Sequence, residues 1–206
     1  SRGLGDVYKR QVIVTEGYVD TIMLHQHGLE NVVAALGTAF TADHILILSR
    51  MTKNIYLCLD ADKAGRSAAK RGIELMENTD ANVYIIEIPL EMAKDPDEFL
   101  QKYPIEEFIK IKKQAASIQK FIIKSILEEY DLSQANSRDR AYNAAMEFLK
   151  EYRSTFTMFQ GIEVCDFIVG KLDMPVGGYN LYRSIFKTDA KDVQSTPTFN
   201  TTSLNK

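Results

Sequence analysis

Residues 54–62 read NIYLCLDAD, an almost entirely apolar run that ends in two aspartates. Such a run, with little polar alternation, is typical of a strand that is buried on both faces of a parallel sheet. It predicts a strand over Asn54–Leu59, with Asp60 and Asp62 directly after its carboxyl end. A strand of this kind needs parallel neighbours, with helices covering both faces of the sheet.

Strands and helices alternate on both sides of this stretch. Short runs rich in β-branched residues predict three further strands, over Val12–Thr15, Asn31–Ala35 and Asn82–Ile88. Helical spacing predicts the segments between the strands, over Val19–His27, Ala42–Met51 and Lys63–Glu77. We therefore expect an α/β fold with a four-stranded parallel sheet, right-handed crossovers and flanking helices.

The pattern changes after Pro104. Four consecutive helices are expected there with no strand between them, over Ile105–Gln114, Ala116–Tyr130, Ser137–Tyr152 and Met158–Leu172. They predict a small α-helical bundle that follows the α/β unit. The expected division is therefore an α/β domain over 12–103, a helical subdomain over 104–186 and a flexible linker or tail over 187–206, which is rich in Ser, Thr, Asn and Lys.

The first eleven residues have no hydrophobic periodicity and join abruptly to the first strand. Asp6 to Gln11 read DVYKRQ, which resembles a translated adapter sequence used in DNA sequencing. We expect residues 1–11 to be non-native, and they do not enter the fold prediction.

Composition restricts the class of protein. The 206 residues are 45% hydrophobic and 26% charged, with a formal net charge of −3. No apolar run approaches the roughly 20 residues of a membrane span, and Cys58 and Cys165 have no CxxC neighbour. These features favour a globular, cytoplasmic protein with no membrane segment and with two buried thiols. The acidic balance is unusual for a nucleic-acid binder, unless metal ions neutralise an acidic site or a basic surface lies elsewhere.

Acidic residues recur where the predicted strands end. Glu16 follows the first strand, Asp60 and Asp62 follow the third, and Asp95 and Asp97 follow the fourth. In open α/β sheets, ligands bind beyond these carboxyl ends, so these side chains are expected to converge. Clustered carboxylates are unfavourable without a cation, and hard oxygen ligands suit Mg²⁺ or Mn²⁺. Gly17 and Gly65 leave room for phosphates to approach the backbone.

Each acidic motif also has a plainer interpretation. A single Asp-x-Asp often caps a helix or stands in solvent, and Glu16-Gly17 alone is a junction between a strand and a turn. Asp97 and Glu98 are equally typical of first-turn acids on a helix. The coincidence of three acidic sites at three strand ends favours a metal centre over these separate explanations.

Four motifs appear in a recognisable order: Glu16–Asp20 (EGYVD), Ala35–Thr41 (ALGTAFT), Asp60–Gly65 (DADKAG) and Asp95–Asp97 (DPD). They resemble the Toprim domain of bacterial DnaG-type DNA primases over about residues 12–103, and more loosely to about residue 186. The resemblance implies that Glu16, Asp60, Asp62 and Asp95 are metal ligands. It also implies that Glu16, Asp60 and Asp62 are catalytic and that Asp20 and Asp97 are supporting acids.

The resemblance also implies a function. It is the Mg²⁺- or Mn²⁺-dependent synthesis of RNA primers from ribonucleoside triphosphates on single-stranded DNA during replication. Family members carry a zinc-binding domain and a basic polymerase half at the N-terminus, and a helicase-binding domain at the C-terminus. We expect zinc and the replicative helicase to bind only those parts. Glu16 is either a ligand or a proton acceptor, and the sequence does not separate these roles.

Rival interpretations remain at this point. Toprim acids also occur in topoisomerases and nucleases, although no tyrosine here has the setting of a topoisomerase nucleophile. The chain is also compatible with an inactive metal-binding Toprim fragment.

Overall fold

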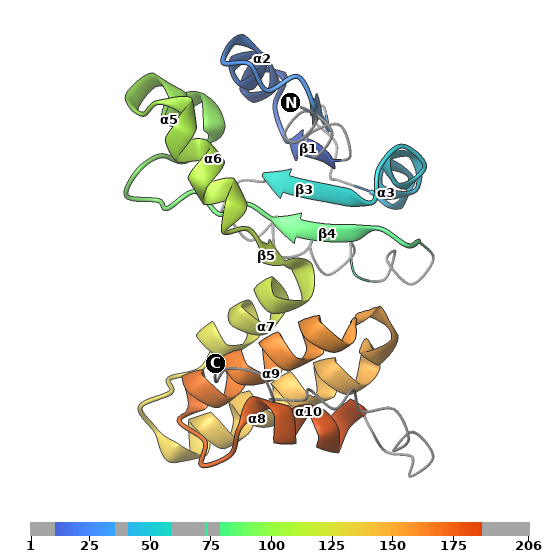
Figure 1. Cartoon of the computed structure of the whole chain (residues 1–206). Helices are drawn as coiled ribbons and strands as arrows, with labels where there is room; N and C mark the ends of the chain where they lie inside the picture. Colours follow the sequence, from blue (N-terminus) through green and yellow to red (C-terminus); the bar gives the residue numbers. More distant parts are fainter. Residues whose placement is uncertain (1–10, 36–40, 59–72, 74–78, 187–206) are drawn as a thin grey trace, which may run out of the picture.

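The computed structural model of the chain describes residues 11–35, 41–58, 73 and 79–186 (Figure 1). The first half contains β1 (Gln11–Thr15), α2 (Tyr18–Gln26), β2 (Val32–Ala34), α3 (Ala42–Ser49), β3 (Asn54–Cys58), β4 (Asn82–Ile85) and α5 (Pro96–Lys102). The second half contains α6 (Ile105–Lys113), β5 (Ala116–Ser117), α7 (Ile118–Glu128), α8 (Ala135–Glu151), the 3-10 turn η1 (Arg153–Thr155), α9 (Met158–Leu172) and α10 (Gly178–Phe186). The expected α/β class, with a helical part after the sheet, is confirmed.

The described strands form one sheet in the order β2-β1-β3-β4-β5. The pairs β1–β2, β1–β3 and β3–β4 are parallel, so the predicted parallel strands are all present. Strand β1 begins one residue earlier than predicted, whereas β2 and β4 are shorter. The sequence did not predict β5, which pairs antiparallel with β4. Its two residues cover the edge of β4 that would otherwise remain unpaired, and so short a strand has no periodicity to detect.

The helix expected over 116–130 is therefore wrong at its start. Ala116 and Ser117 belong to β5, and α7 begins only at Ile118. The Ser117 side chain accepts a hydrogen bond from the backbone N–H of Lys120, so it caps the helix. The same serine thus ends the sheet and begins the helical part.

The sheet has a separate apolar core on each face. Val12 and Val14 of β1 belong to one core, which also contains Ile45 of α3 and continues into the helices α7 to α10. Ile13 belongs to the other core, together with Leu24 of α2 and residues of α5 and α6. This alternation is the period of two of a strand with both faces covered. Figure 1 shows α5 and α6 on the opposite side of the sheet from α3.

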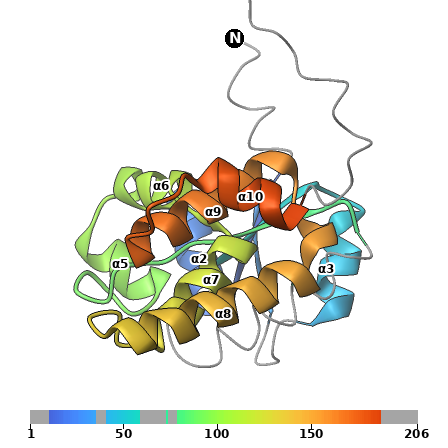
Figure 2. The same cartoon turned by 90° about the horizontal axis from the view of Figure 1, so that it is seen from below.

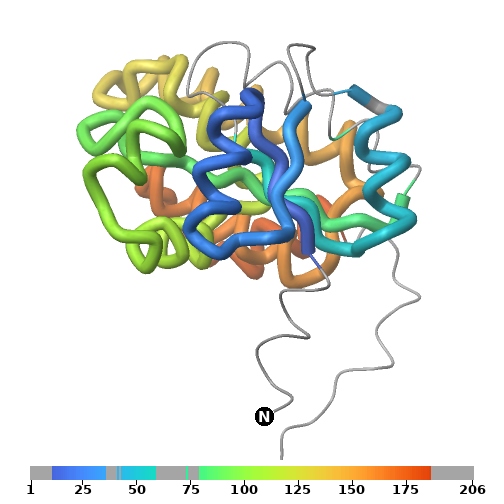
Figure 3. Tube along the Cα trace, turned by 90° about the horizontal axis from the view of Figure 1, so that it is seen from above, coloured from blue at the N-terminus to red at the C-terminus, as the bar shows by residue number. Residues whose placement is uncertain are grey.

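Helices α7 to α10 lie beyond the β4–β5 edge of the sheet (Figure 1), and they form the near layer in Figure 2. The sequence did not predict α10, because Gly177 precedes it and its first turn contains Gly178 and Asn180, which are poor helix formers. Tertiary packing overrides this, since Leu181, Tyr182 and Ile185 are buried. Seen from the other end, Figure 3 has α2 and the strands β1 and β2 in front.

Gln11, at the end of the segment expected to be non-native, is the first residue of β1. Its backbone pairs with Asn54, and the Nζ atom of Lys112 donates a 2.7 Å hydrogen bond to its Oε1 atom. The expected boundary after residue 11 therefore falls inside a strand. Within the ranges that the structure describes, no helix is both long and apolar enough to cross a membrane.

The two cysteine thiols are buried, as expected. Burial raises the pKa of the Cys165 thiol to about 12. This thiol is therefore a packing group and not a nucleophile at neutral pH.

Candidate metal centre

The turn after β1 holds Glu16. Thr15 is fully buried, and its hydroxyl donates a 3.1 Å hydrogen bond to the Gly17 carbonyl. The hydroxyls of Thr15 and Thr21 lie 2.7 Å apart, and Thr21 also donates to the Gly17 carbonyl, at 3.4 Å. These contacts tie the turn to the first helical turn of α2, so the half-buried Glu16 stands on a supported backbone.

The turn after β1 lies at a position in the sheet that favours ligand binding. Strand β1 lies between β2 and β3, so the chain leaves β1 toward one side of the sheet and later returns on the other side. Such a reversal creates a crevice at the carboxyl ends of the two central strands, which is the usual ligand site of open α/β sheets. Thr15 of β1 is in register with Cys58, the last residue of β3. Glu16 therefore lies at the mouth of this crevice.

The N-terminus of α5 holds the last acidic motif. Asp95 is the N-cap, and its Oδ1 atom accepts a 2.7 Å hydrogen bond from the backbone N–H of Glu98. Its Oδ2 atom lies 3.8 Å from the Nζ atom of Lys94. Pro96 occupies the first turn of the helix, where its missing N–H is not needed. Asp97 and Glu98 lie in the first turn of this helix, as the plainer interpretation of these acids expects.

Glu98 supports the same helix start. Hydrogen bonds from the Lys102 ammonium and the Lys94 backbone N–H hold the pKa of Glu98 below its usual value. Its Oε1 atom lies 2.6 Å from the Nζ atom of Lys102. Glu98 is thus engaged in the structure of the helix, in line with the plainer interpretation of this acid.

A hydrogen bond joins the first and last acidic motifs. The backbone N–H of Asp97 donates to the Oδ1 atom of Asp20 at 3.2 Å, across 77 positions of sequence. A methyl group at Gly17 would come within 2.9 Å of the Oδ2 atom of Asp20. Glycine at position 17 therefore leaves space for the Asp20 carboxylate, which in turn anchors α5. Asp97 itself accepts a 3.0 Å hydrogen bond from the side chain of Gln101.

The structure thus associates Glu16, Gly17 and Asp20 with Asp95 and Asp97 through the contact between α2 and α5. The predicted residues Asp60, Asp62 and Gly65 lie outside the described residues. Among the residues that are described, no group of three or more His, Cys, Asp or Glu side chains is close enough to hold a metal ion. The described donors are nevertheless half-buried carboxylates at the carboxyl end of β1 and the start of α5, which are hard oxygen ligands suited to a divalent cation.

Sequence reasoning missed the contribution of Thr15 and Thr21. Both resemble ordinary β-branched residues of a strand and a helix, and nothing in their spacing reveals that their hydroxyls meet. It also assigned Asp20 a general supporting role, whereas the structure shows its specific contact, the amide of Asp97.

Comparison with known proteins identifies the family. Residues 13–100 match the family described as Toprim-like. The DNA primase of Clostridium acetobutylicum is 37% identical over 140 residues, which cover 68% of this chain and 23% of that protein. The primase catalytic core of E. coli has a TM-score of 0.59 at 32% identity, covering 79% of this chain and 51% of that one. A DnaG primase catalytic domain bound to single-stranded DNA has a TM-score of 0.60 at 30% identity, covering 80% and 51%.

The chain belongs to the DnaG-type primase family. It spans about a quarter of the length of the curated primases that it matches. The similarity to the solved primase structures extends past residues 13–100 into the helical part, because these structures match about four fifths of the chain. Membership in the primase family implies the use of a divalent metal.

Proposed function

We propose that this chain carries the metal-holding part of a DNA primase, which synthesises RNA primers on single-stranded DNA. The observation that best supports this function is the hydrogen bond between the Asp97 amide and Asp20, because it brings the first and last acidic motifs of the primase pattern together. The relative that was solved with single-stranded DNA supports the choice of template. Ribonucleoside triphosphates are the proposed substrates.

In this proposal Glu16, Asp60, Asp62 and Asp95 hold Mg²⁺ or Mn²⁺. The bound metal would lower the pKa of a 3′-hydroxyl and stabilise the pyrophosphate leaving group. The remaining contribution of the chain is positioning: Asp20 and Asp97 fix α5 against α2, and Gly17 leaves space for Asp20. Gly65 has the corresponding proposed role after Asp62.

Partners and location follow the same proposal. A net charge of −3 provides little non-specific attraction for phosphates. We therefore assign template retention and zinc binding to N-terminal regions of the longer relatives, and contact with the replicative helicase to their C-terminal regions. The proposed location is the cytoplasm.

The proposal also includes the domain division. It consists of a unit over 12–103, a helical unit over 104–186, a non-native segment over 1–11 and a linker or tail over 187–206. Strand β5 lies after residue 103 and nevertheless completes the sheet of the first unit.

Two measurements on this chain test the proposal. Mn²⁺ binding followed by electron paramagnetic resonance should show saturable sites that Asp60→Ala weakens, while circular dichroism shows an unchanged fold. A primer-synthesis assay with template, ribonucleotides and Mn²⁺ or Mg²⁺ then separates an active chain from a metal-binding fragment without activity. Cleavage of DNA with metal alone would instead favour a nuclease, and unaltered Mn²⁺ binding in Asp60→Ala would refute the assignment of the site.

A further inference from the structure

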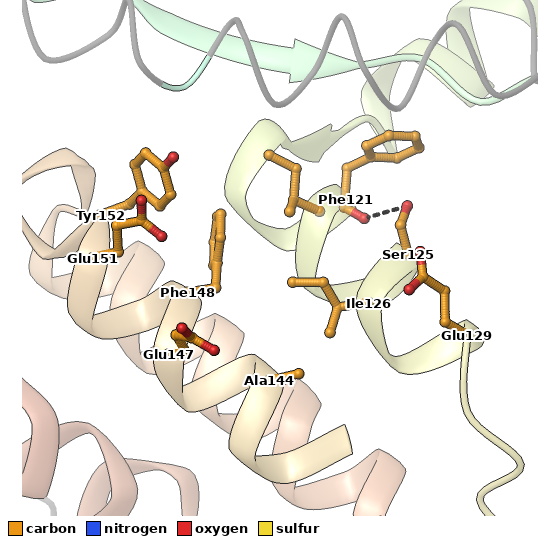
Figure 4. Close-up of a pocket in the computed structure, with 10 residues that line it drawn as sticks. Phe121, Ser125, Ile126, Glu129, Ala144, Glu147, Phe148, Glu151 and Tyr152 are labelled. Carbon is orange, nitrogen blue, oxygen red and sulfur yellow. Dashed lines mark hydrogen bonds between the residues drawn. The ribbon is translucent and has the colours of Figure 1, made fainter. Parts of the chain in front are cut away.

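A groove lies between α7 and α8, in the helical part and away from the candidate metal centre. Its volume is about 400 Å³. Figure 4 shows side chains from both helices pointing into it. Its apolar lining includes Phe121 and Ile126 of α7 and Phe148 of α8, and its rim includes Glu129, Glu147 and Glu151. We call these six residues the α7–α8 groove.

The groove has the periodicity of a helix on both walls. On α8, Glu147 and Glu151 stand one turn apart, and Phe148 lies beside them. On α7, Ile122 and Ile126 stand one turn apart, and Glu129, the C-cap residue of this helix, continues the same stripe three residues later. Ridges with this spacing accept a further helix, whose side chains would enter between them.

The three rim carboxylates have no partner in the part of the chain that the structure describes. Each residue is exposed, and within the described residues no hydrogen bond or ion pair engages the carboxylate of Glu129, Glu147 or Glu151. Nearby glutamates differ, because Glu163 and Glu87 pair with lysines of α7, at 2.7 and 2.8 Å. The groove therefore combines an apolar lining with unneutralised negative charge.

We propose that the α7–α8 groove binds an amphipathic helix of a partner protein. The partner helix carries two basic side chains four residues apart, which meet Glu147 and Glu151, and a large apolar side chain between them, which enters beside Phe148. Charge complementarity selects this occupant, because a basic helix neutralises the rim, whereas the phosphates of a nucleic acid would be repelled. The 11 residues of α7 extend over about 16 Å at 1.5 Å per residue, so three turns of partner helix are enough.

The test uses the 206-residue chain and a synthetic alanine-rich helical peptide. The peptide carries one leucine and two lysines spaced four residues apart on the same face. Fluorescence anisotropy should show saturable binding that the double variant Glu147→Lys/Glu151→Lys weakens at least about tenfold, the equivalent of 1.4 kcal/mol. A peptide of the same composition in scrambled order should bind at least about tenfold more weakly to the unaltered chain.

The matched control is Glu106→Lys/Glu128→Lys. Both residues are exposed and lie outside the groove, and the change in net charge is the same. This control should keep the affinity of the unaltered chain. Thermal melting of both double variants should be unchanged, since all four positions are on helix surfaces.

Three outcomes would overturn the proposal. Equal weakening in the control would show general attraction between opposite charges, and equal affinity for the scrambled peptide would show that no helical face is recognised. Tighter peptide binding after removal of residues 187–206 would identify the end of this chain as the occupant.

Discussion

The molecule has two acidic surfaces that differ in how their carboxylates are held. In the candidate metal centre, Asp20, Asp95 and Asp97 each accept a hydrogen bond from the protein itself. In the α7–α8 groove, the rim glutamates Glu147 and Glu151 accept none from the described residues. Carboxylates that are oriented in advance suit a small, hard cation with strict geometry, whereas free ones suit long, mobile basic side chains.

The largest expected effect is on primer synthesis, which should depend on the metal centre and not on the α7–α8 groove. Asp60→Ala should abolish primer synthesis in a complete primase that contains this chain, because it removes a proposed metal ligand while the fold is retained. Neutralising the groove with Glu129→Gln/Glu147→Gln/Glu151→Gln should leave primer synthesis unchanged. Incorporation of labelled ribonucleotides measures both, and synthesis at the normal rate by Asp60→Ala would end the assignment.

The next effect concerns the packing that supports the metal centre. Phe99 of α5 is fully buried and contacts the rings of Tyr103 and Phe108. Phe99→Ala should lower the free energy of unfolding by about 3–5 kcal/mol, as measured by urea denaturation. Phe159 is 82% exposed on α9, so Phe159→Ala should change it by less than about 0.5 kcal/mol. Similar losses for the two variants would contradict the assigned packing.

The third prediction concerns the hydrogen bond between Asp20 and the Asp97 amide, which joins the first and last acidic motifs. Asp20→Ala removes the acceptor of the Asp97 amide, and the affinity for Mn²⁺ should fall about 10- to 100-fold, as for other groups that orient metal ligands. Asp20→Asn keeps an oxygen in the same place and should retain most of the affinity. An asparagine variant as weak as the alanine variant would show that Asp20 acts through its charge.

The smallest expected effect is on the pH dependence of stability and comes from Lys112 of α6, on the metal-centre side of the sheet. Its side chain is buried above the Tyr56 ring, and burial lowers its pKa from 10.5 to about 8. Between these pH values the unfolded chain binds more protons than the folded one, so the contribution of this group to stability rises with pH from about 8 to 10.5. Lys112→Met should lack this rise when urea unfolding is compared at pH 7.5 and pH 10. An identical pH dependence in both proteins would contradict it.

The sequence predicted the parallel strands, most helices and the family because these depend on local patterns. The run at Asn54–Cys58 is apolar enough to indicate a doubly covered strand, and the motif at Glu16–Asp20 is recognisable without any structure. The outcome for Asp60, Asp62 and Gly65 remains a prediction, since they lie outside the described residues.

Contacts between distant segments could not be predicted in the same way. Strand β5 exists because the edge of β4 recruits Ala116 and Ser117, and α10 exists because α9 buries Leu181 and Ile185. Neither has a local signal strong enough to detect. Both depend on which surfaces the rest of the fold leaves open.

The sequence by itself determined the alternation of strands and helices and the presence of acids at the strand ends. Periodicity and turn residues act over a few positions, so they are legible in the chain. Only the tertiary structure decided that Asp20 accepts a hydrogen bond from the amide of Asp97, and that Glu129, at the end of α7, lines the same groove as Glu147 and Glu151 of α8. These pairings join residues far apart in sequence, and they are set by packing against the two faces of the sheet and between neighbouring helices.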